Sequence, residues 1–202
     1  MAAVAHARVK AICVYCGSSI GRDPAYAARA AQLGERIARE RLALVYGGGD
    51  VGLMGVVADA VLAADGEVIG VIPEQLVGWE VAHRGLTRLE IVATMHERKA
   101  RMFDLSDAFV ALPGGFGTLD EMFEMLTWRQ LGLGDKPCAF LDVDGYYVPL
   151  MAMLDRMLAE GFLREEHRSG LWHGEDIDAL IDWIRRERPS APRDPKLRKD
   201  QR

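Results

Sequence analysis

The feature that most constrains the fold of this chain is an alternation of short apolar runs with longer segments of helical character. Six runs are rich in β-branched and other apolar residues: 9–16, 42–47, 67–73, 86–94, 107–114 and 137–143. Such runs, separated by helical segments, are typical of βαβ units. Because their apolar character is nearly continuous, we expect helices on both faces of the sheet. The pattern predicts an α/β fold with a doubly wound, mostly parallel sheet.

Local signals mark where several helices begin and end. Asp23, followed by a proline, predicts the start of a helix that runs to about Arg41. Gly66 and Gly161 are placed to end two later helices. Right-handed crossovers would then put the loop after each strand along one edge of the sheet, where open α/β folds bind ligands.

The length of the chain sets the number of domains. With 202 residues, half of them apolar, the chain can bury one sizeable core. We expect a single Rossmann-like domain over residues 1–188. Residues 189–202 are rich in proline and charged residues, which predicts a disordered tail.

Charge and cysteine content narrow the class of function. The net charge of -5 does not favour nucleic-acid binding. Three irregularly spaced cysteines make no disulfide framework and fit a reducing compartment. No segment approaches the roughly 18 apolar residues of a membrane span, and residues 1–10 carry no export pattern. We therefore expect a cytoplasmic protein that binds neither nucleic acid nor membranes.

Three of the predicted strands end in small, glycine-rich loops. These are CGSS at residues 16–19, YGGGDVGLMG at 46–55 and PGGFGTLDE at 113–121. Glycines between a strand and a helix let the backbone approach a phosphate, and the helix N-terminus offers free N–H donors. A single such loop could be only a tight turn. Two long ones on one edge predict a phosphorylated ligand.

Two familiar nucleotide-binding motifs bear on these loops. Gly47, Gly49 and Gly52 satisfy G-x-G-x-x-G, but the motif follows the second strand. The acidic residue expected about 20 positions later would be Glu67 or Glu74, neither well placed for a dinucleotide. The phosphate loop G-x-x-x-x-G-K-[ST] is absent from the sequence, which argues against an ATPase or kinase.

Glu121 has two interpretations. Thr118 and Glu121 form T-x-x-E, a capping box in which the threonine caps the helix and the glutamate bonds back to the cap N–H. Glu121 would also lie near the predicted ligand, where a carboxylate can act in catalysis. The spacing alone favours capping.

Arg98 and Lys99, in MHERK, also have two interpretations. They lie near the start of a predicted helix on the ligand edge. Both could belong to a solvated helix face. Alternatively they are a pair of cations for a phosphate, of which arginine can bind two oxygens at once.

The residue patterns of metal sites and of serine hydrolases are not found in the sequence. Cys13 and Cys16 are three apart, so they would point to opposite faces of a strand and make no zinc site. The five histidines show no metal-ligand spacing, and G-x-S-x-G is absent from the sequence. We predict no metal site and no serine hydrolase.

Taken in order, YGGGDVGLMG, MHERK and PGGFGTLDE closely resemble the LONELY GUY family of cytokinin riboside 5'-monophosphate phosphoribohydrolases, often mislabelled lysine decarboxylases. The resemblance runs from about Val9 to Phe162 and includes CGSS, KP at Lys136 and DGYY near Gly145. It implies hydrolysis of the N-glycosidic bond of N6-substituted adenosine 5'-monophosphates, without metal or cofactor.

The resemblance also implies the site residues. Arg98 and Glu121 match the catalytic arginine and glutamate, so Glu121 would have a dual role as cap and catalyst. Asp120 stands where the family commonly has a second glutamate. The substrate site would be lined by Ser18, Gly47, Gly48, Gly49, Glu80, Met95, Lys99, Gly114, Gly115, Phe116, Gly117, Thr118 and Thr127.

The residues fit this chemistry, because a carboxylate can stabilise an oxocarbenium-like transition state and orient the attacking water. Arg98 could stabilise the leaving base or hold the 5'-phosphate. A general AMP nucleosidase and a nucleotide or cofactor carrier of the same fold remain alternatives at this point.

The resemblance further implies a homodimer with the site near the subunit contact. The helix segment MFEMLTWRQL could serve that contact or be ordinary core.

Overall fold

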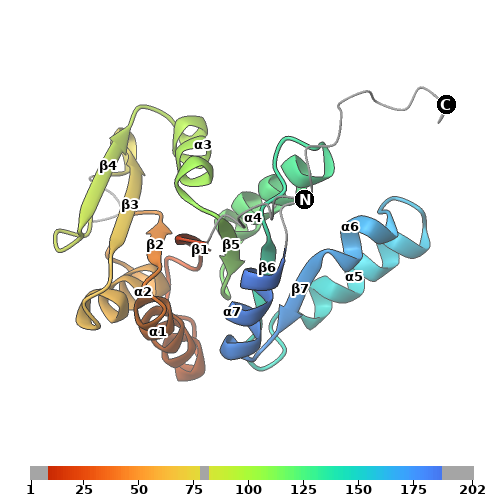
Figure 1. Cartoon of the computed structure of the whole chain (residues 1–202), viewed down its shortest axis with the longest axis horizontal. Helices are drawn as coiled ribbons and strands as arrows, with labels where there is room; N and C mark the ends of the chain where they lie inside the picture. The colour runs from red at the N-terminus through yellow and green to blue at the C-terminus, as the bar shows by residue number, and fades with distance from the viewer. Residues whose placement is uncertain (1–8, 78–81, 188–202) are drawn as a thin grey trace, which may run out of the picture.

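In residues 9–77 and 82–187, which this computed structural model describes, seven parallel strands form one sheet (Figure 1). The strands lie side by side in the order β4-β3-β2-β1-β5-β6-β7. Their bounds are β1 Ala11–Tyr15, β2 Ala43–Tyr46, β3 Val68–Pro73, β4 Arg88–Val92, β5 Ala108–Ala111, β6 Cys138–Leu141 and β7 Leu171–Gly174. The sheet confirms the predicted Rossmann-like α/β class.

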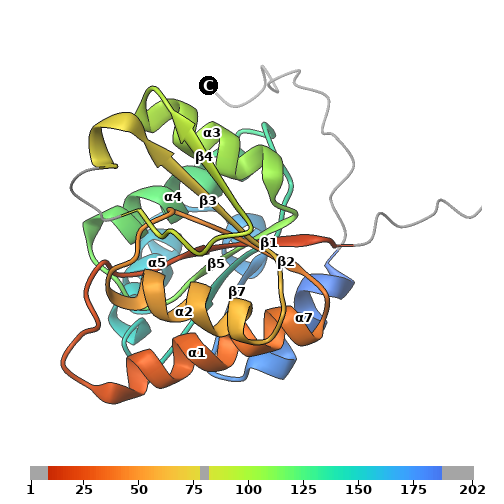
Figure 2. The same cartoon turned by 90° about the vertical axis from the view of Figure 1, so that its left-hand side faces the viewer.

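Helices cover the sheet in two layers, with α1, α2 and α7 on one face and α3, α4 and α5 on the other (Figure 2). The bounds are α1 Pro24–Arg39, α2 Gly52–Ala63, α3 Met95–Leu105, α4 Phe116–Gln130, α5 Val148–Ala159, α6 Glu165–Ser169 and α7 Ile177–Arg186, with a 3₁₀ turn at Glu74–Leu76. None of these helices has the length and apolar character of a membrane crossing.

Two apolar clusters, one on each face, hold the three layers together. Side chains alternate between the faces of a strand, so residues an odd number of positions apart enter different clusters. Cys16 belongs to the cluster under α1, α2 and α7, and Cys13 to the other. This confirms that the C-x-x-C pair is split between the two faces. All three cysteines are buried and free, and burial raises the pKa of Cys138 to about 12.

The predicted helix signals agree with the structure in two cases and fail in one. Asp23 caps α1, and its Oδ1 accepts a hydrogen bond of 2.8 Å from the Ala25 N–H. Gly161 follows α5 with a φ of 78°, the left-handed backbone that suits glycine. The α2 helix, however, already ends at Ala63, and Asp65 rather than Gly66 takes the left-handed conformation.

Two strands depart from the sequence expectation. β4 lies at the edge of the sheet, and its residues are exposed or half-buried, so the expected cover on both faces is wrong there. β7, with the sequence LWHG, forms the other edge and was not among the six predicted runs. Both edge strands are less buried than the central ones, and a strand that is not covered on both faces needs no continuous apolar run.

The order of the strands determines where a ligand can bind. The chain leaves β1 toward β2, β3 and β4 on one side, and then continues at β5 on the other side of β1. The loops after β1 and β5 therefore diverge at the carboxyl ends of adjacent strands. In open α/β sheets this switch point forms a crevice for ligands.

Candidate active site

The glycine-rich loops meet at this switch point, as the sequence predicts for loops along one edge. The backbone N–H of Gly17, after β1, donates to the carbonyl of Pro113, after β5, over 3.1 Å. The Gly17 carbonyl in turn accepts a hydrogen bond of 3.0 Å from Leu53 at the start of α2. The loop after β1 thus joins the other two loops through backbone contacts.

Close packing within this edge explains two of the glycines. A Cβ on Gly47 would lie 2.1 Å from Nη2 of Arg98, and a Cβ on Gly114 would lie 2.1 Å from Oγ1 of Thr118. By contrast, a Cβ on Gly115 or Gly117 would meet nothing within 4 Å. The first turn of α4 therefore has open space beside its backbone, where a ligand can approach its N–H groups.

The capping box predicted at Thr118 and Glu121 is wrong. α4 begins at Phe116 with Gly115 at the cap position, and no side chain caps it. Thr118 is consequently the third residue of the helix, and its side chain is buried. Because the glycine starts the helix early, Glu121 lies in the second turn, beyond the reach of a cap.

A second T-x-x-E in the chain does form a cap. Thr94 precedes α3, and its Oγ1 accepts a hydrogen bond of 3.1 Å from the Glu97 N–H. Glu97 returns the interaction by accepting 3.0 Å from the N–H of Ala93. This cap fixes the start of α3, the helix that carries Arg98.

Arg98 is a buried cation in the first turn of α3, with only 5% of its surface exposed. Its Nη2 donates to the carbonyl of Gly47 at 3.3 Å and lies 3.7 Å from Oε1 of Glu121, while Nη1 lies 3.8 Å from the sulfur of Met95. Its Nε has no hydrogen-bond partner among the described residues. A solvated helix face is therefore excluded for Arg98, and the guanidinium retains donors for a ligand.

Lys99, the next residue, has a different environment. Its Nζ lies 2.7 Å from Oδ2 of Asp120 and 3.1 Å from Oε2 of Glu124, both on α4. Burial alone would lower the pKa of Lys99, but the two facing carboxylates outweigh it and raise the pKa above its usual 10.5. Lys99 is therefore charged at neutral pH and already paired.

The remaining predicted residues divide into three groups. Around the switch point the structure places Ser18, Gly47, Gly48, Gly49, Met95, Gly114, Gly115, Phe116, Gly117 and Thr118. Thr127 lies apart from them: it is six residues beyond Glu121, or about 9 Å along α4, and its hydroxyl donates to the Phe123 carbonyl. Glu80 lies outside the described residues.

Two tyrosines of the DGYY segment contact the loop after β5. The hydroxyl of Tyr146 donates to the carbonyl of Gly114, and that of Tyr147 to the carbonyl of Leu112, each over 2.6 Å. Both bonds hold the loop after β5. The sequence offers no spacing rule that links DGYY to PGG across more than 30 positions, so only the resemblance pointed to this segment.

His83 supports the glycine loop, a role that no sequence motif predicts. Its backbone N–H donates to the Gly48 carbonyl at 3.0 Å, and its Nε2 lies 2.9 Å from Oδ1 of Asp59 on α2. Since Nδ1 accepts a hydrogen bond from the Gly85 N–H, the ring proton is on Nε2 and faces Asp59. Asp50, Asp59 and His83 place ligand-type atoms within 4.8 Å of one another, but this proton occupies the nitrogen that a metal would need.

Fold and site together define a Rossmann-like α/β protein with a glycine-lined site at the switch point and a buried arginine beside a glutamate. A family model described as possible lysine decarboxylase matches residues 54–183. A protein of Rhodococcoides fascians named cytokinin riboside 5'-monophosphate phosphoribohydrolase is 48% identical over 177 residues, 87% of this chain and 89% of the relative. A probable enzyme of the same name from Oryza sativa subsp. japonica, LOGL1, is 50% identical over 157 residues, 78% of this chain and 70% of the relative.

The chain belongs to this family, in agreement with the resemblance read from its motifs. Among solved structures, the molybdenum cofactor binding protein of Rippkaea orientalis superimposes with a TM-score of 0.67 at 24% identity, covering 88% of this chain and 96% of that one. That likeness shows the fold alone.

Proposed function

We propose that this chain is a nucleoside 5'-monophosphate phosphoribohydrolase that cleaves N6-substituted adenosine 5'-monophosphates into a free base, a cytokinin, and ribose 5-phosphate. The observation that carries the proposal is the pair of Arg98 and Glu121, 3.7 Å apart beside three glycine-rich loops. The names of the relatives, at 48% and 50% identity, support the same reaction.

The 5'-phosphate binds at the first turn of α4 in this proposal. Gly115 and Gly117 leave the backbone there open, and no side chain caps the helix. Free N–H groups and the positive end of the helix dipole favour a dianion at this position. Binding of the phosphate then positions the ribose near Glu121, which is one turn further along α4.

Glu121 acts on the reacting carbon of the ribose. As the bond from C1' to the base nitrogen breaks, the sugar gains positive charge, which a carboxylate stabilises. The same carboxylate orients the water whose oxygen forms the new bond to C1'. The base leaves with the bonding electron pair and takes up a proton.

Arg98 supplies positive charge beside this carboxylate, 3.7 Å from Oε1 of Glu121. Its burial makes each hydrogen bond from the guanidinium stronger than it would be in water. The guanidinium carries more N–H donors than its contacts to Gly47 and Met95 use, and these serve an anionic group of the nucleotide, either the departing base or the phosphate.

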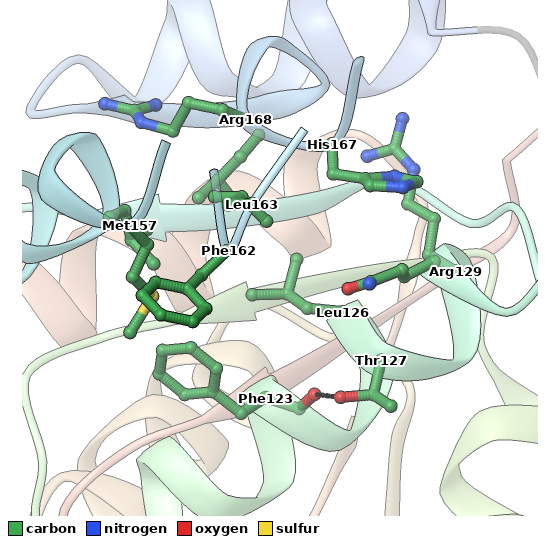
Figure 3. A pocket seen from close by; sticks show the side chains of 12 residues that line it. Phe123, Leu126, Thr127, Arg129, Met157, Phe162, Leu163, His167 and Arg168 are labelled. Atoms are coloured by element: carbon green, nitrogen blue, oxygen red, sulfur yellow. Dashed lines mark hydrogen bonds between the residues drawn. The ribbon is translucent and has the colours of Figure 1, made fainter. Parts of the chain in front are cut away.

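The enzyme would act as a homodimer in the cytosol, where its three cysteines stay reduced. Phe116, Leu131, Leu133 and Phe162 are large apolar side chains that are mostly exposed on and near α4. Phe162 also borders a cavity of about 230 Å³, lined by Phe123, Leu126 and Met157 among others (Figure 3). A second copy that covers this face would bury exposed apolar surface, the usual driving force of association.

Thr127 supports the same arrangement. It lines this cavity on the outer surface of α4, whereas Met122 and Met125 of the same helix are core residues. Thr127 cannot face Glu121 of its own chain. If it lines a substrate site, as the resemblance implies, it does so in the partner.

The deciding experiment is to incubate the protein with AMP and, separately, with isopentenyladenosine 5'-monophosphate, and to follow the free base by chromatography. The Glu121→Gln variant should fold normally and release no base, since it keeps the shape of the side chain and removes its charge. Glu35→Gln on α1, an exposed glutamate, is the matched control and should be fully active. The ratio of the two rates separates a cytokinin enzyme from a general AMP nucleosidase. Binding of both nucleotides without cleavage would show a carrier instead.

A further inference from the structure

Three successive carbonyl groups of the loop after β5 each accept a hydrogen bond from another segment of the chain. In order along the loop, the acceptor and donor pairs are Leu112 with the hydroxyl of Tyr147 over 2.6 Å, Pro113 with the N–H of Gly17 over 3.1 Å, and Gly114 with the hydroxyl of Tyr146 over 2.6 Å. The loop that leads into α4 is therefore held one peptide group at a time.

The direction of each carbonyl also sets the direction of the next N–H group. A trans peptide group is planar, with its C=O and its N–H on opposite sides. Holding the Gly114 carbonyl toward Tyr146 therefore turns the N–H of Gly115 away from Tyr146. Gly115 is the cap residue of α4, so its N–H has no acceptor within the helix. A Cβ on Gly115 would meet nothing within 4 Å, so a ligand has room beside this donor.

We infer that Tyr146 is a positioning residue for the 5'-phosphate: its hydroxyl fixes the peptide group between Gly114 and Gly115 so that the Gly115 N–H donates to a phosphate oxygen. This inference rests on the proposed function, since it deepens the phosphate site at the first turn of α4. Tyr146 acts through the backbone and not by direct contact. A hydroxyl has one proton, and that of Tyr146 is already given to the Gly114 carbonyl.

The neighbouring Tyr147 makes a bond of the same length with a different consequence. The residue after Leu112 is Pro113, which has no N–H, so orienting the Leu112 carbonyl presents no donor to a ligand. Tyr147 is also only 1% exposed, whereas Tyr146 is 41% exposed. Tyr147 therefore supports the core, and of these two tyrosines only Tyr146 directs a donor of the phosphate site.

The turn that carries Tyr146 is itself anchored. Oδ1 of Asp142, a buried carboxylate, accepts a hydrogen bond of 3.0 Å from the N–H of Tyr147, and its Oδ2 lies 2.7 Å from Nε2 of His173 on β7. The ring of Tyr146 packs edge to face with the rings of Tyr26 and Tyr147. None of these contacts uses the hydroxyl of Tyr146, so they remain when that hydroxyl alone is removed.

The test removes this hydroxyl and compares ligands that share the phosphate. In the inactive Glu121→Gln background, Tyr146→Phe should weaken the binding of AMP about three- to tenfold, the loss expected for one hydrogen bond. Ribose 5-phosphate, which has no base, should lose the same factor. Calorimetry measures both Kd values. A loss for AMP without a loss for ribose 5-phosphate would place the effect at the base and overturn the inference, as would an unchanged Kd for AMP.

The Gly115 amide gives a direct readout of the positioning. In nuclear magnetic resonance spectra of the Glu121→Gln protein, AMP should shift the Gly115 amide proton downfield, because this proton enters a charge-assisted hydrogen bond. The shift should be reduced in the Tyr146→Phe variant at saturating AMP. A Gly115 amide that AMP does not move, or that moves equally in both proteins, would overturn the inference.

Two further tyrosines are the controls. Tyr147→Phe should lower Tm, because it leaves the Leu112 carbonyl without its donor, yet keep the Kd for AMP within about twofold. Tyr26→Phe keeps the ring that touches Tyr146 and should change neither quantity. Weakening of AMP binding by Tyr147→Phe as large as that by Tyr146→Phe would contradict the argument from the peptide groups.

Failure of the proposed function would be seen separately. If the unmodified protein binds AMP but releases no base, the hydrolase proposal is refuted, while the binding comparison still decides whether Tyr146 directs a phosphate donor. If neither AMP nor ribose 5-phosphate binds, both proposals are refuted.

Discussion

Arg98 and Gly47 are in direct contact: Nη2 of the guanidinium donates to the Gly47 carbonyl over 3.3 Å, and the space for a Cβ on Gly47 is filled by that same nitrogen. The loop after β2 therefore packs directly against the guanidinium group of Arg98. If a side chain is added at Gly47, the guanidinium can move away, since it is the end of a long and flexible side chain.

Gly47→Ala is expected to displace the guanidinium without disrupting the fold. The added Cβ would lie 2.1 Å from Nη2, and the arginine side chain can rotate away at little cost in folding free energy. We expect kcat to fall about 100-fold, as for a misplaced catalytic group, with a small change in Tm. Thermal unfolding and base release measure the two effects. A variant that keeps full activity would show that Arg98 need not occupy this position.

Gly114→Ala offers the contrasting case at the loop after β5. Its Cβ would meet not only Thr118 but also the backbone N of Gly17 at 2.8 Å, which cannot yield as a side chain can. The change should therefore lower Tm as well as activity. Equal Tm values for the two alanine variants would contradict this distinction.

His83→Ala should loosen the glycine loop from α2. The variant loses the side-chain bonds to Asp59 and Gly85, so we expect a loss of about 1 to 3 kcal/mol in the free energy of unfolding. KM for the nucleotide should rise, because the backbone N–H of residue 83, which bonds the Gly48 carbonyl and remains in the variant, loses the side-chain anchors that hold it in place. Urea unfolding and steady-state kinetics measure both. Asp59→Asn keeps an oxygen that can accept from Nε2 and should show a smaller effect; the reverse order would refute this assignment.

The ion pair between Glu90 and Arg101 is expected to make the free energy of unfolding depend on pH. The hydrogen bonds from Arg101 in α3, at 2.6 and 3.1 Å, lower the pKa of Glu90 below its usual 4.5 against the opposing effect of burial. A carboxyl group whose pKa is lower in the folded chain than in the unfolded chain stabilises the fold when the pH is above its pKa in the unfolded chain. This stabilisation is lost as the pH falls through its pKa in the folded chain.

Glu90→Gln should therefore lose less stability than the unmodified chain between about pH 6 and about pH 3. The difference should be under about 1 kcal/mol, since the pair is partly exposed. Urea unfolding at the two pH values measures it, and Arg101→Gln should give the same reduced slope. Unchanged pH dependence in both variants would rule out this pair as a source of acid sensitivity.

Phe162→Asp should prevent self-association. Phe162 is 85% exposed beside the apolar cavity next to α4, so a charge there opposes burial against a second copy. Sedimentation should show a dimer for the unmodified chain and a monomer for the variant. Ile91→Asp, on the exposed edge strand β4, is the matched control and should stay dimeric. A monomeric unmodified chain would exclude the proposed homodimer.

The sequence predicts the sheet better than it predicts the details of the site. Apolar runs identify six strands because buried parallel strands need them, while the four residues of β7 include a half-buried Trp172 and His173 and carry little signal. The predicted topology alone is enough to place the glycine loops on one edge of the sheet. Which T-x-x-E forms a cap could not be predicted, because that depends on where each helix starts, and Gly115 starts α4 early.

The roles of the charged residues required the fold. Nothing in MHERK distinguishes a buried arginine from a paired lysine, since their surroundings come from Gly47 on one loop and from Asp120 and Glu124 on another helix. Position 121 could be recognised as acidic and near the ligand, but its distance to Arg98 is a tertiary property. The same holds for the support that His83 gives to Gly48.

The order of the strands also divides the reaction between two parts of the chain. Arg98 and the loop after β2 belong to the part that ends with α3, and Glu121 enters only with β5 and α4 on the other side of β1. During synthesis the first part emerges with its arginine but without the glutamate. An incomplete chain is thus unable to cleave nucleotides, and appearance of activity reports that both halves of the sheet have joined at β1.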